Sequence, residues 1–186
     1  IREARDKVRR NGAMLDAAIA ADPDDAYLCY KHAQHLVTDA DYAGAVGSAE
    51  RALELSASGH ASRGALGVSN LADTYRTLIA AHLALGNVSA AVVAGERGTA
   101  ACPDHPPLWT QFGLALLGSG APDRALIAFQ EARSRRDMPV IGAIDRGSAG
   151  WRALYGMGEA YLELKRPADA QASLAQALID APSHPL

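Results

Sequence analysis

The sequence is poor in aromatic residues and in cysteine, and it carries little excess charge. Aromatic residues make up 5% of the 186 residues, and the 18 basic and 21 acidic residues leave a net charge of −3. A near-neutral chain lacks the positive footprint of nucleic-acid-binding proteins, so we expect no nucleic-acid partner. The two cysteines, Cys29 and Cys102, are too few for a disulfide scaffold. They fit a reducing compartment, which predicts a cytoplasmic protein.

Long apolar runs are also missing. A long stretch without a charged residue, 105–122, contains three glycines and three prolines. A membrane-spanning helix needs about 20 predominantly apolar residues, so we expect no membrane insertion. The sequence begins at Ile1 without a signal-peptide pattern. We expect it to be a piece of a longer protein, with part of the function outside it.

Alanine and leucine are abundant, with 40 and 21 residues respectively. Both have high helix propensity, and no segment shows the alternation and β-branched content of a strand. The sequence therefore predicts an all-α fold. The expected helices span residues 2–21, 25–38, 42–56, 69–85, 88–101, 106–119, 122–136, 149–164 and 168–180.

One pattern of large and small residues occurs twice in the second half of the chain. Its copies are Trp109-x2-Phe112-Gly113-x2-Leu116 with Ala125-x3-Phe129, and Leu154-x2-Met157-Gly158-x2-Tyr161 with Ala170-x3-Leu174. Glycine costs about 1 kcal/mol relative to alanine inside a helix, so its use predicts a close approach of two helices. The pattern resembles the tetratricopeptide (TPR) repeat, W-x2-L-G-x2-Y followed by A-x3-F.

Looser copies begin at Cys29 and Tyr75, and Leu15-x2-Ala18 before Pro23 is similar to the second helix of a preceding repeat. The resemblance implies a right-handed superhelical solenoid of antiparallel helix pairs, with residues 1–186 as a single TPR array. Its expected parts are a half-repeat at 1–23, full repeats at 26–59, 72–105, 106–139 and 151–184, and insertions at 60–71 and 140–150. We interpret the insertions as longer connections and not as functional lids.

The opening half-repeat contains Arg10-Asn11-x2-Met14-Leu15 and ends in Asp22-Pro23-Asp24-Asp25. These residues resemble the segment that joins a family-two glycosyltransferase domain to a C-terminal TPR array in many bacterial proteins. The resemblance implies a parent protein that transfers a sugar from a nucleotide donor, with the catalytic domain before Ile1. The array would then recruit the acceptor protein or mediate dimerisation. The alternative is a stand-alone TPR scaffold or regulator with no attached enzyme.

Two D-x-D sequences and one arginine cluster are candidates for binding a metal ion, a phosphate or an acidic partner. Asp22-Pro23-Asp24 and Asp39-Ala40-Asp41 have the form of a metal–diphosphate site. Both lie between expected helices, where aspartate caps the following helix, and we favour capping. Arg133-Ser134-Arg135-Arg136 ends an expected helix, where cations interact favourably with the helix dipole. We favour a solvated helix end over a patch that binds phosphate or an acidic partner.

Cys29, His32 and His35 follow one another at intervals of three residues, so a metal site is conceivable. However, Cys29 and His32 occupy repeat positions that face the core. We expect a buried, hydrogen-bonded histidine beside an apolar cysteine. The sequence therefore predicts no metal, no cofactor and no catalytic residues in this chain.

In TPR proteins the first helix of each pair lines a concave groove that binds peptides, and the resemblance implies the same surface here. The residues at inward-facing positions are Tyr27, Tyr30, Gln34, Asp73, Arg76, Thr110, Arg152, Tyr155 and Glu159. Tyrosine and arginine are enriched at binding hot spots. We therefore expect a protein or peptide partner in the groove, and we also consider a homodimer. The alternative interpretation, that these residues lie on ordinary solvated helix faces, stays open.

Overall fold

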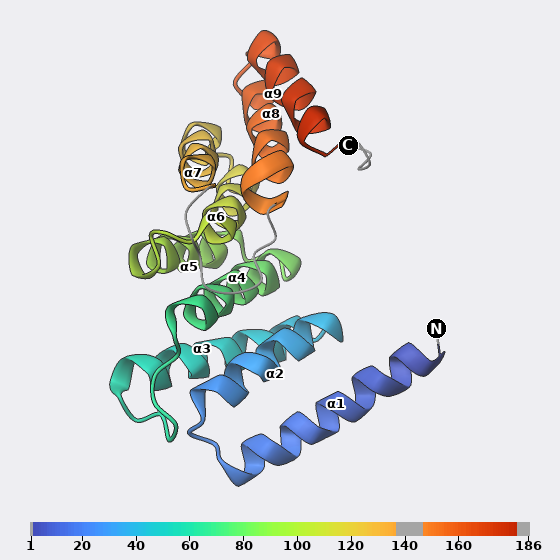
Figure 1. Cartoon of the computed structure of the whole chain (residues 1–186), viewed down its shortest axis with the longest axis vertical. Helices are drawn as coiled ribbons and strands as arrows, with labels where there is room; N and C mark the ends of the chain where they lie inside the picture. The colour runs from blue at the N-terminus through green and yellow to red at the C-terminus, as the bar shows by residue number, and fades with distance from the viewer. Residues whose placement is uncertain (1, 137–146, 182–186) are drawn as a thin grey trace. The chain divides into compact units, whose positions relative to one another are not determined.

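The computed structural model describes residues 2–136 and 147–181, and every regular element in these ranges is a helix (Figure 1). This confirms the predicted all-α class. The elements are α1 (Arg2–Ala21), α2 (Ala26–Thr38), α3 (Tyr42–Ser58), α4 (Val68–Ala84), α5 (Val88–Ala101), α6 (Pro106–Gly118), α7 (Pro122–Ser134), η1 (Ser148–Arg152), α8 (Ala153–Glu163) and α9 (Pro167–Asp180). None of these helices combines the length and the apolar character that a membrane span requires.

The predicted helix bounds agree with the structure to within two residues, with one exception. The helix expected over 149–164 is divided at Gly150, whose backbone (φ −92°, ψ −117°) is not helical, so the π-helical segment η1 precedes α8. In the expected insertion 60–71, α4 already begins at Val68. Residues 140–146 of the second expected insertion lie outside the described ranges.

The chain divides into two compact units, Ile1–Asn87 and Val88–Leu186. In the first unit α2 packs on α3, α4 packs on both of these helices, and α1 packs on α2. In the second unit α6 packs on α7 and α8 on α9, while α8 also packs on α6 and α7, and α5 packs on α6. Within the units, the successive helices α2 and α3, α6 and α7, and α8 and α9 are joined by short turns and form antiparallel pairs, as the repeat pattern predicts.

Small residues let the helices of the first unit approach closely. Ala33 of α2 and Ala45, Ala49 and Ala52 of α3 are fully buried. Next to them Ala26, Cys29 and Tyr30 form a cluster with Ala52 and Leu55. Their small side chains let the backbones of α2 and α3 approach each other closely.

Phe129 of α7 occupies the centre of the core of the second unit, where its side chain is completely buried. A Cβ atom built on Gly113 of α6 would lie 2.5 Å from the Phe129 ring, and one built on Gly156 of α8 would also lie well inside the 3.0 Å limit of real contacts. The two glycines thus accommodate one ring from opposite helices. The close approach predicted at Gly113 is confirmed, whereas the role of Gly156 was not predicted.

Aspartates in or next to the two D-x-D sequences cap the helices that follow, although at one junction the capping aspartate lies outside the D-x-D sequence. Asp25 accepts hydrogen bonds from the backbone N–H groups of Tyr27 and Leu28, and Asp41 accepts one from Gly44. Capping explains why these carboxylates lie between helices. At the first junction the cap is Asp25, the residue immediately after the D-x-D.

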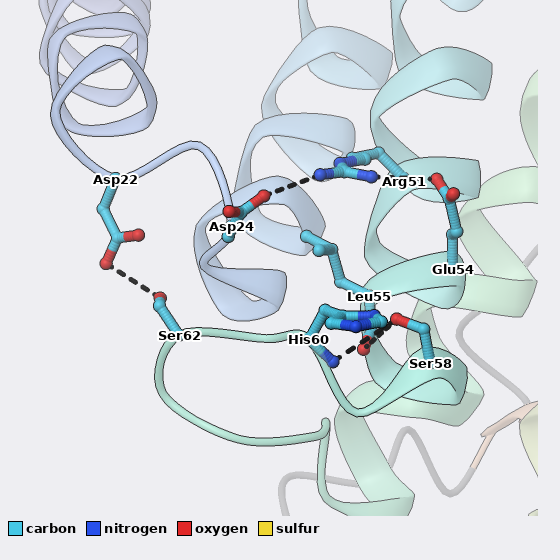
Figure 2. A network of polar contacts seen from close by, with 8 residues as sticks. All are labelled: Asp22, Asp24, Arg51, Glu54, Leu55, Ser58, His60 and Ser62. Carbon is cyan, nitrogen blue, oxygen red and sulfur yellow. Dashed lines mark hydrogen bonds and ion pairs between the residues drawn. The ribbon is translucent and has the colours of Figure 1, made fainter.

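The loop between α3 and α4 is held against the turn that joins α1 to α2. The Ser62 hydroxyl donates to Asp22 (2.9 Å), as Figure 2 shows, and the Ser62 N–H donates to the Asp24 carbonyl (2.9 Å). Arg51 of α3 also donates to the Asp24 carboxylate (2.6 Å). Arg63 lies 3.2 Å from the buried carboxylate of Asp25. These contacts agree with the interpretation of this insertion as a structural connection.

Candidate functional site

Five of the predicted groove residues lie in the first unit, on two helices that contact each other. Tyr27, Tyr30 and Gln34 recur at three- and four-residue intervals on α2, and Asp73 and Arg76 lie one turn apart on α4. Residues at such intervals share one helix face. Together with Lys31, also on α2, we call these residues the Tyr30 cluster. The stacking of α4 on α2 therefore brings together residues more than 35 positions apart in the sequence.

Tyr30 is the buried centre of this cluster, with 3% of its surface exposed. Burial raises the pKa of its hydroxyl to about 12, and the negative charge of Asp73 acts in the same direction. Hydrogen bonding to Gln34 opposes that rise in pKa, and hydrogen bonding to Asp73 supports it. At neutral pH the hydroxyl is therefore protonated and serves as a donor between α2 and α4.

Tyr27 and Lys31 form the exposed part of the cluster. Tyr27 is 46% exposed, and its ring centre lies 5.8 Å from that of Tyr30 at an angle of 57°. The Lys31 Nζ atom lies 5.6 Å from the centre of the Tyr27 ring and 4.9 Å from that of Tyr30. Attraction between a cation and an aromatic face orients the lysine over the two rings. Lys31 also donates to Gln34 (3.3 Å).

Asp73 and Arg76 form a half-exposed ion pair at the other side of the cluster. The Arg76 Nη1 atom lies 2.6 Å from an Asp73 carboxylate oxygen. The Arg76 Nε atom is buried and has no hydrogen-bond partner among the described residues. Buried donors are nearly always paired in folded proteins, so this N–H is an exception in the part of the chain that the structure describes.

Three further groove candidates lie in the second unit, at or near the start of α8. Arg152, Tyr155 and Glu159 share one helix face, at intervals of three and four residues. Hydrogen bonding to Glu159 raises the pKa of Tyr155, and the charge of Glu159 adds to that rise. The Arg152 guanidinium lies 5.1 Å from the centre of the Trp151 ring. This face again combines aromatic and charged groups.

Thr110, like Tyr30, is buried, with 4% of its surface exposed. Its hydroxyl donates to the Ser148 carbonyl (2.8 Å). Thr110 thus links α6 to η1 and presents no surface to a ligand. The groove position expected at Thr110 is corrected for this reason.

The other chemical candidates also have structural partners. The His32 Nδ1 atom lies 2.9 Å from the Ser48 hydroxyl, and its Nε2 atom lies 3.1 Å from an Asp16 carboxylate oxygen. Burial raises the pKa of the neighbouring Cys29 thiol. Among the residues that the structure describes, no three His, Cys, Asp or Glu side chains are placed to hold a metal ion. His32 therefore serves as a link between helices.

The arginine cluster at the end of α7 is engaged within the second unit. Arg133 and Arg136 lie 3.9 Å and 3.1 Å from the Asp180 carboxylate of α9, and Arg135 pairs with Glu131. The cluster joins the end of α7 to the end of α9. These contacts give the arginines a structural role that the sequence did not predict.

Comparisons with solved structures identify the fold. The crystal structure of MamA superimposes with a TM-score of 0.74 and 18% sequence identity, covering 97% of this chain and 92% of MamA. YrrB, described as a TPR protein with an unusual peptide-binding site, gives a TM-score of 0.68 and 21% identity, over 98% of this chain and 82% of YrrB. A thermophilic TPR protein of Thermus thermophilus gives a TM-score of 0.66 and 19% sequence identity, covering 97% of this chain and 87% of the Thermus protein.

No family model matches the sequence, and no curated protein matches it. At these identities the structural likeness establishes the fold alone. The chain therefore has the TPR fold that its repeat pattern predicts.

Proposed function

We propose that this chain is a non-catalytic TPR scaffold that binds a protein or peptide through the Tyr30 cluster. The observation that carries the proposal is the contact of Tyr30 with Asp73, which joins the helix that carries the exposed aromatic ring and the oriented lysine to the helix that carries Arg76. The peptide-binding site named for the similar structure of YrrB adds support from another protein of this fold.

The chemistry of the cluster defines the expected ligand. The exposed Tyr27 ring offers a flat apolar surface to an apolar or aromatic side chain of the peptide. Lys31 and Arg76 carry two positive charges against the one negative charge of Asp73, so the cluster favours a carboxylate. A guanidinium binds a carboxylate through directional, charge-assisted hydrogen bonds. We therefore expect an extended peptide that presents an apolar residue close to an acidic one.

The face formed by Arg152, Tyr155 and Glu159 is proposed as a second contact surface in the other unit. Its support is the combination of a partly exposed tyrosine and glutamate with an exposed arginine at the first helix of a pair.

A finer proposal concerns the protein around this array. The resemblance of Arg10-Asn11-x2-Met14-Leu15 and of the Asp22-Pro23 turn to the linker of bacterial family-two glycosyltransferases supports a glycosyltransferase parent in the cytoplasm. The array would then recruit the acceptor protein or mediate dimerisation. The alternative is a stand-alone scaffold or regulator. The coding sequence upstream of Ile1 distinguishes them, because a D-x-D-containing α/β domain there supports the first proposal and its absence supports the second.

The binding proposal is tested with peptides selected from a displayed random library on the full chain. Isothermal titration should show that Tyr27→Ala and Arg76→Gln each weaken a selected peptide about tenfold or more, within the range of hot-spot residues. The matched control is Arg124→Gln, because Arg124 also forms an exposed ion pair, 2.7 Å from Glu96. Equal affinity of the two cluster variants and the wild type would refute the proposal.

A further inference from the structure

The connection between α3 and α4, residues 59–67, contacts the helix that carries the aromatic rings of the Tyr30 cluster. Ala61 and Leu66 of this connection pack against the group of buried side chains that includes Tyr30. The Leu66 N–H also donates to the Ser56 hydroxyl of α3 (3.1 Å). The connection is therefore packed beside the buried ring of the proposed peptide site.

Arg63 in the same connection lies against the residue that caps α2. Its Nε atom lies 3.2 Å from the Oδ2 atom of Asp25. The other carboxylate oxygen of Asp25, Oδ1, accepts hydrogen bonds from the N–H groups of Tyr27 (2.8 Å) and Leu28 (3.1 Å). Asp25 thus joins the connection to the first turn of α2.

The Asp25 carboxylate is buried, with 2% of its side chain exposed, whereas the Arg63 side chain is 73% exposed. Removing an ionised carboxylate from water is costly unless hydrogen bonds and a positive charge compensate. The bond from the Ser62 N–H to the Asp24 carbonyl (2.9 Å) holds the connection at this turn, next to the cap. Arg63 therefore stabilises the carboxylate in the position from which it caps α2.

The cap determines the conformation of the turn that carries Tyr27. The first N–H groups of a helix have no acceptor within the helix, so the first turn depends on its cap. Tyr27 lies in this turn, and its partly exposed ring contacts the rings and charges of the cluster through Tyr30 and Lys31. A frayed first turn would move the Tyr27 ring away from both residues.

From these contacts we propose that Arg63 is a positioning residue of the peptide site, which acts through the Asp25 cap on the Tyr27 ring. The inference rests on the proposed binding function of the Tyr30 cluster. The connection of residues 59–67 then holds the first turn of α2 in the conformation that presents Tyr27 to a peptide. Arg63 does this without contacting the peptide itself.

Hydrogen exchange of the full chain without peptide, resolved by residue, tests the positioning step. Arg63→Gln should speed exchange of the Tyr27 and Leu28 amides about threefold, because it removes the charge beside the cap. Arg63→Lys keeps that charge and should retain most of the protection. Arg51→Gln is the matched control: Arg51 pairs with the neighbouring Asp24 (2.6 Å), which is not the cap, so the two amides should exchange as in the wild type.

Isothermal titration with a peptide selected on the wild-type chain tests the effect on binding. Arg63→Gln should weaken the peptide about threefold, and Arg63→Lys should restore most of the affinity. Because Arg63 acts through Tyr27, adding Arg63→Gln to Tyr27→Ala should weaken binding no further than Tyr27→Ala alone. Residues that act on one contact have non-additive effects of this kind.

Unchanged exchange of the two amides in Arg63→Gln would overturn the positioning proposal, whatever the peptide data show. Equal acceleration by Arg51→Gln would also overturn it, because the whole turn and not the cap would then control α2. So would additive losses of affinity for Arg63→Gln and Tyr27→Ala. By contrast, normal peptide affinity in both Tyr27→Ala and Arg76→Gln refutes the binding site itself, and the exchange data distinguish the two failures.

Discussion

Replacing Gly156 by alanine tests the packing around Phe129. The added methyl group would overlap the Phe129 ring, which is completely buried and bounded on another side by Gly113. Overpacking a well-packed core typically costs about 1–3 kcal/mol. Alanine also gains about 1 kcal/mol over glycine in helix propensity, which offsets part of this cost. Because the overlap with the ring is deep, we place the overpacking cost at about 2–3 kcal/mol and expect Gly156→Ala to lower the free energy of unfolding by about 1–2 kcal/mol.

Gly47→Ala is the matched control for this substitution. Gly47 lies within α3, and a Cβ atom built there would meet nothing within 4 Å. Only the propensity gain remains, so the variant should be more stable by about 0.5–1 kcal/mol. Thermal unfolding followed by circular dichroism should show a lower Tm for Gly156→Ala and a higher Tm for Gly47→Ala. The expected changes follow from about 2–4 °C per kcal/mol at this chain length.

The two tryptophans, Trp109 and Trp151, both belong to the second unit, so their fluorescence reports its unfolding separately. A Gly156→Ala protein as stable as the wild type would refute the reasoning, because the ring would then have room to move. A second check combines Gly156→Ala with Phe129→Leu. Residues in contact have non-additive effects, so the double variant should lose less stability than the sum of the two single variants. Additive losses would contradict the contact.

The remaining predictions concern the polar contacts. The pKa of Tyr30 is raised from 10.0 to about 12, so alkaline titration of tyrosine absorbance should show one late phase that is absent in Tyr30→Phe. The contribution of protonated Tyr30 to stability is complete below pH 10 and should decrease by up to about 2–3 kcal/mol as the pH rises through 12, which denaturation of wild type and Tyr30→Phe measures. Thr110→Val should cost about 1 kcal/mol in urea denaturation by removing a buried hydrogen bond, and Thr110→Ser should recover most of it. Asp25→Ala should lower stability by about 1–2 kcal/mol through loss of the α2 cap, and Asp25→Asn should cost less.

The helices were predictable because residues close to each helix end determine where the helix begins and stops. Pro106 and Pro122 lie in the first turns of α6 and α7, where the missing N–H of proline costs nothing. Gly86 and Gly120 have φ values of 75° and 73°, the left-handed conformation expected at the turns after α4 and α6. Such signals act over a few residues, so no knowledge of packing is required.

Contacts between repeats were only partly predictable. The motif identifies Gly113 because the glycine position belongs to the repeat itself, but Gly156 contacts Phe129 of the preceding pair. The burial of Thr110 was also not predictable from the repeat pattern. It depends on a contact with Ser148 in η1, a residue that the sequence assigned to an insertion. Repeat patterns thus locate the members of each helix pair more reliably than the contacts between pairs.

The residues of the proposed site were only partly predictable from residue types and their spacing. The groove positions on α2 and α4 were proposed from the resemblance to TPR proteins, and in the structure Tyr30 of α2 interacts with Asp73 of α4. Lys31 was missed, although its four-residue spacing from Tyr27 puts both residues on one helix face. The unpaired Nε donor of Arg76 had no signal in the sequence, because it depends on where Asp73 lies.

Hydrogen exchange of the full chain with and without a selected peptide tests the central claim most directly, because it locates the contact without any substitution. If the Tyr30 cluster is the binding site, exchange should slow in α2 and α4, around Tyr30 and Arg76, with a smaller effect allowed in α8. Protection limited to the connection between α3 and α4, or to helices α5 and α7, with α2 and α4 unchanged, would contradict the account.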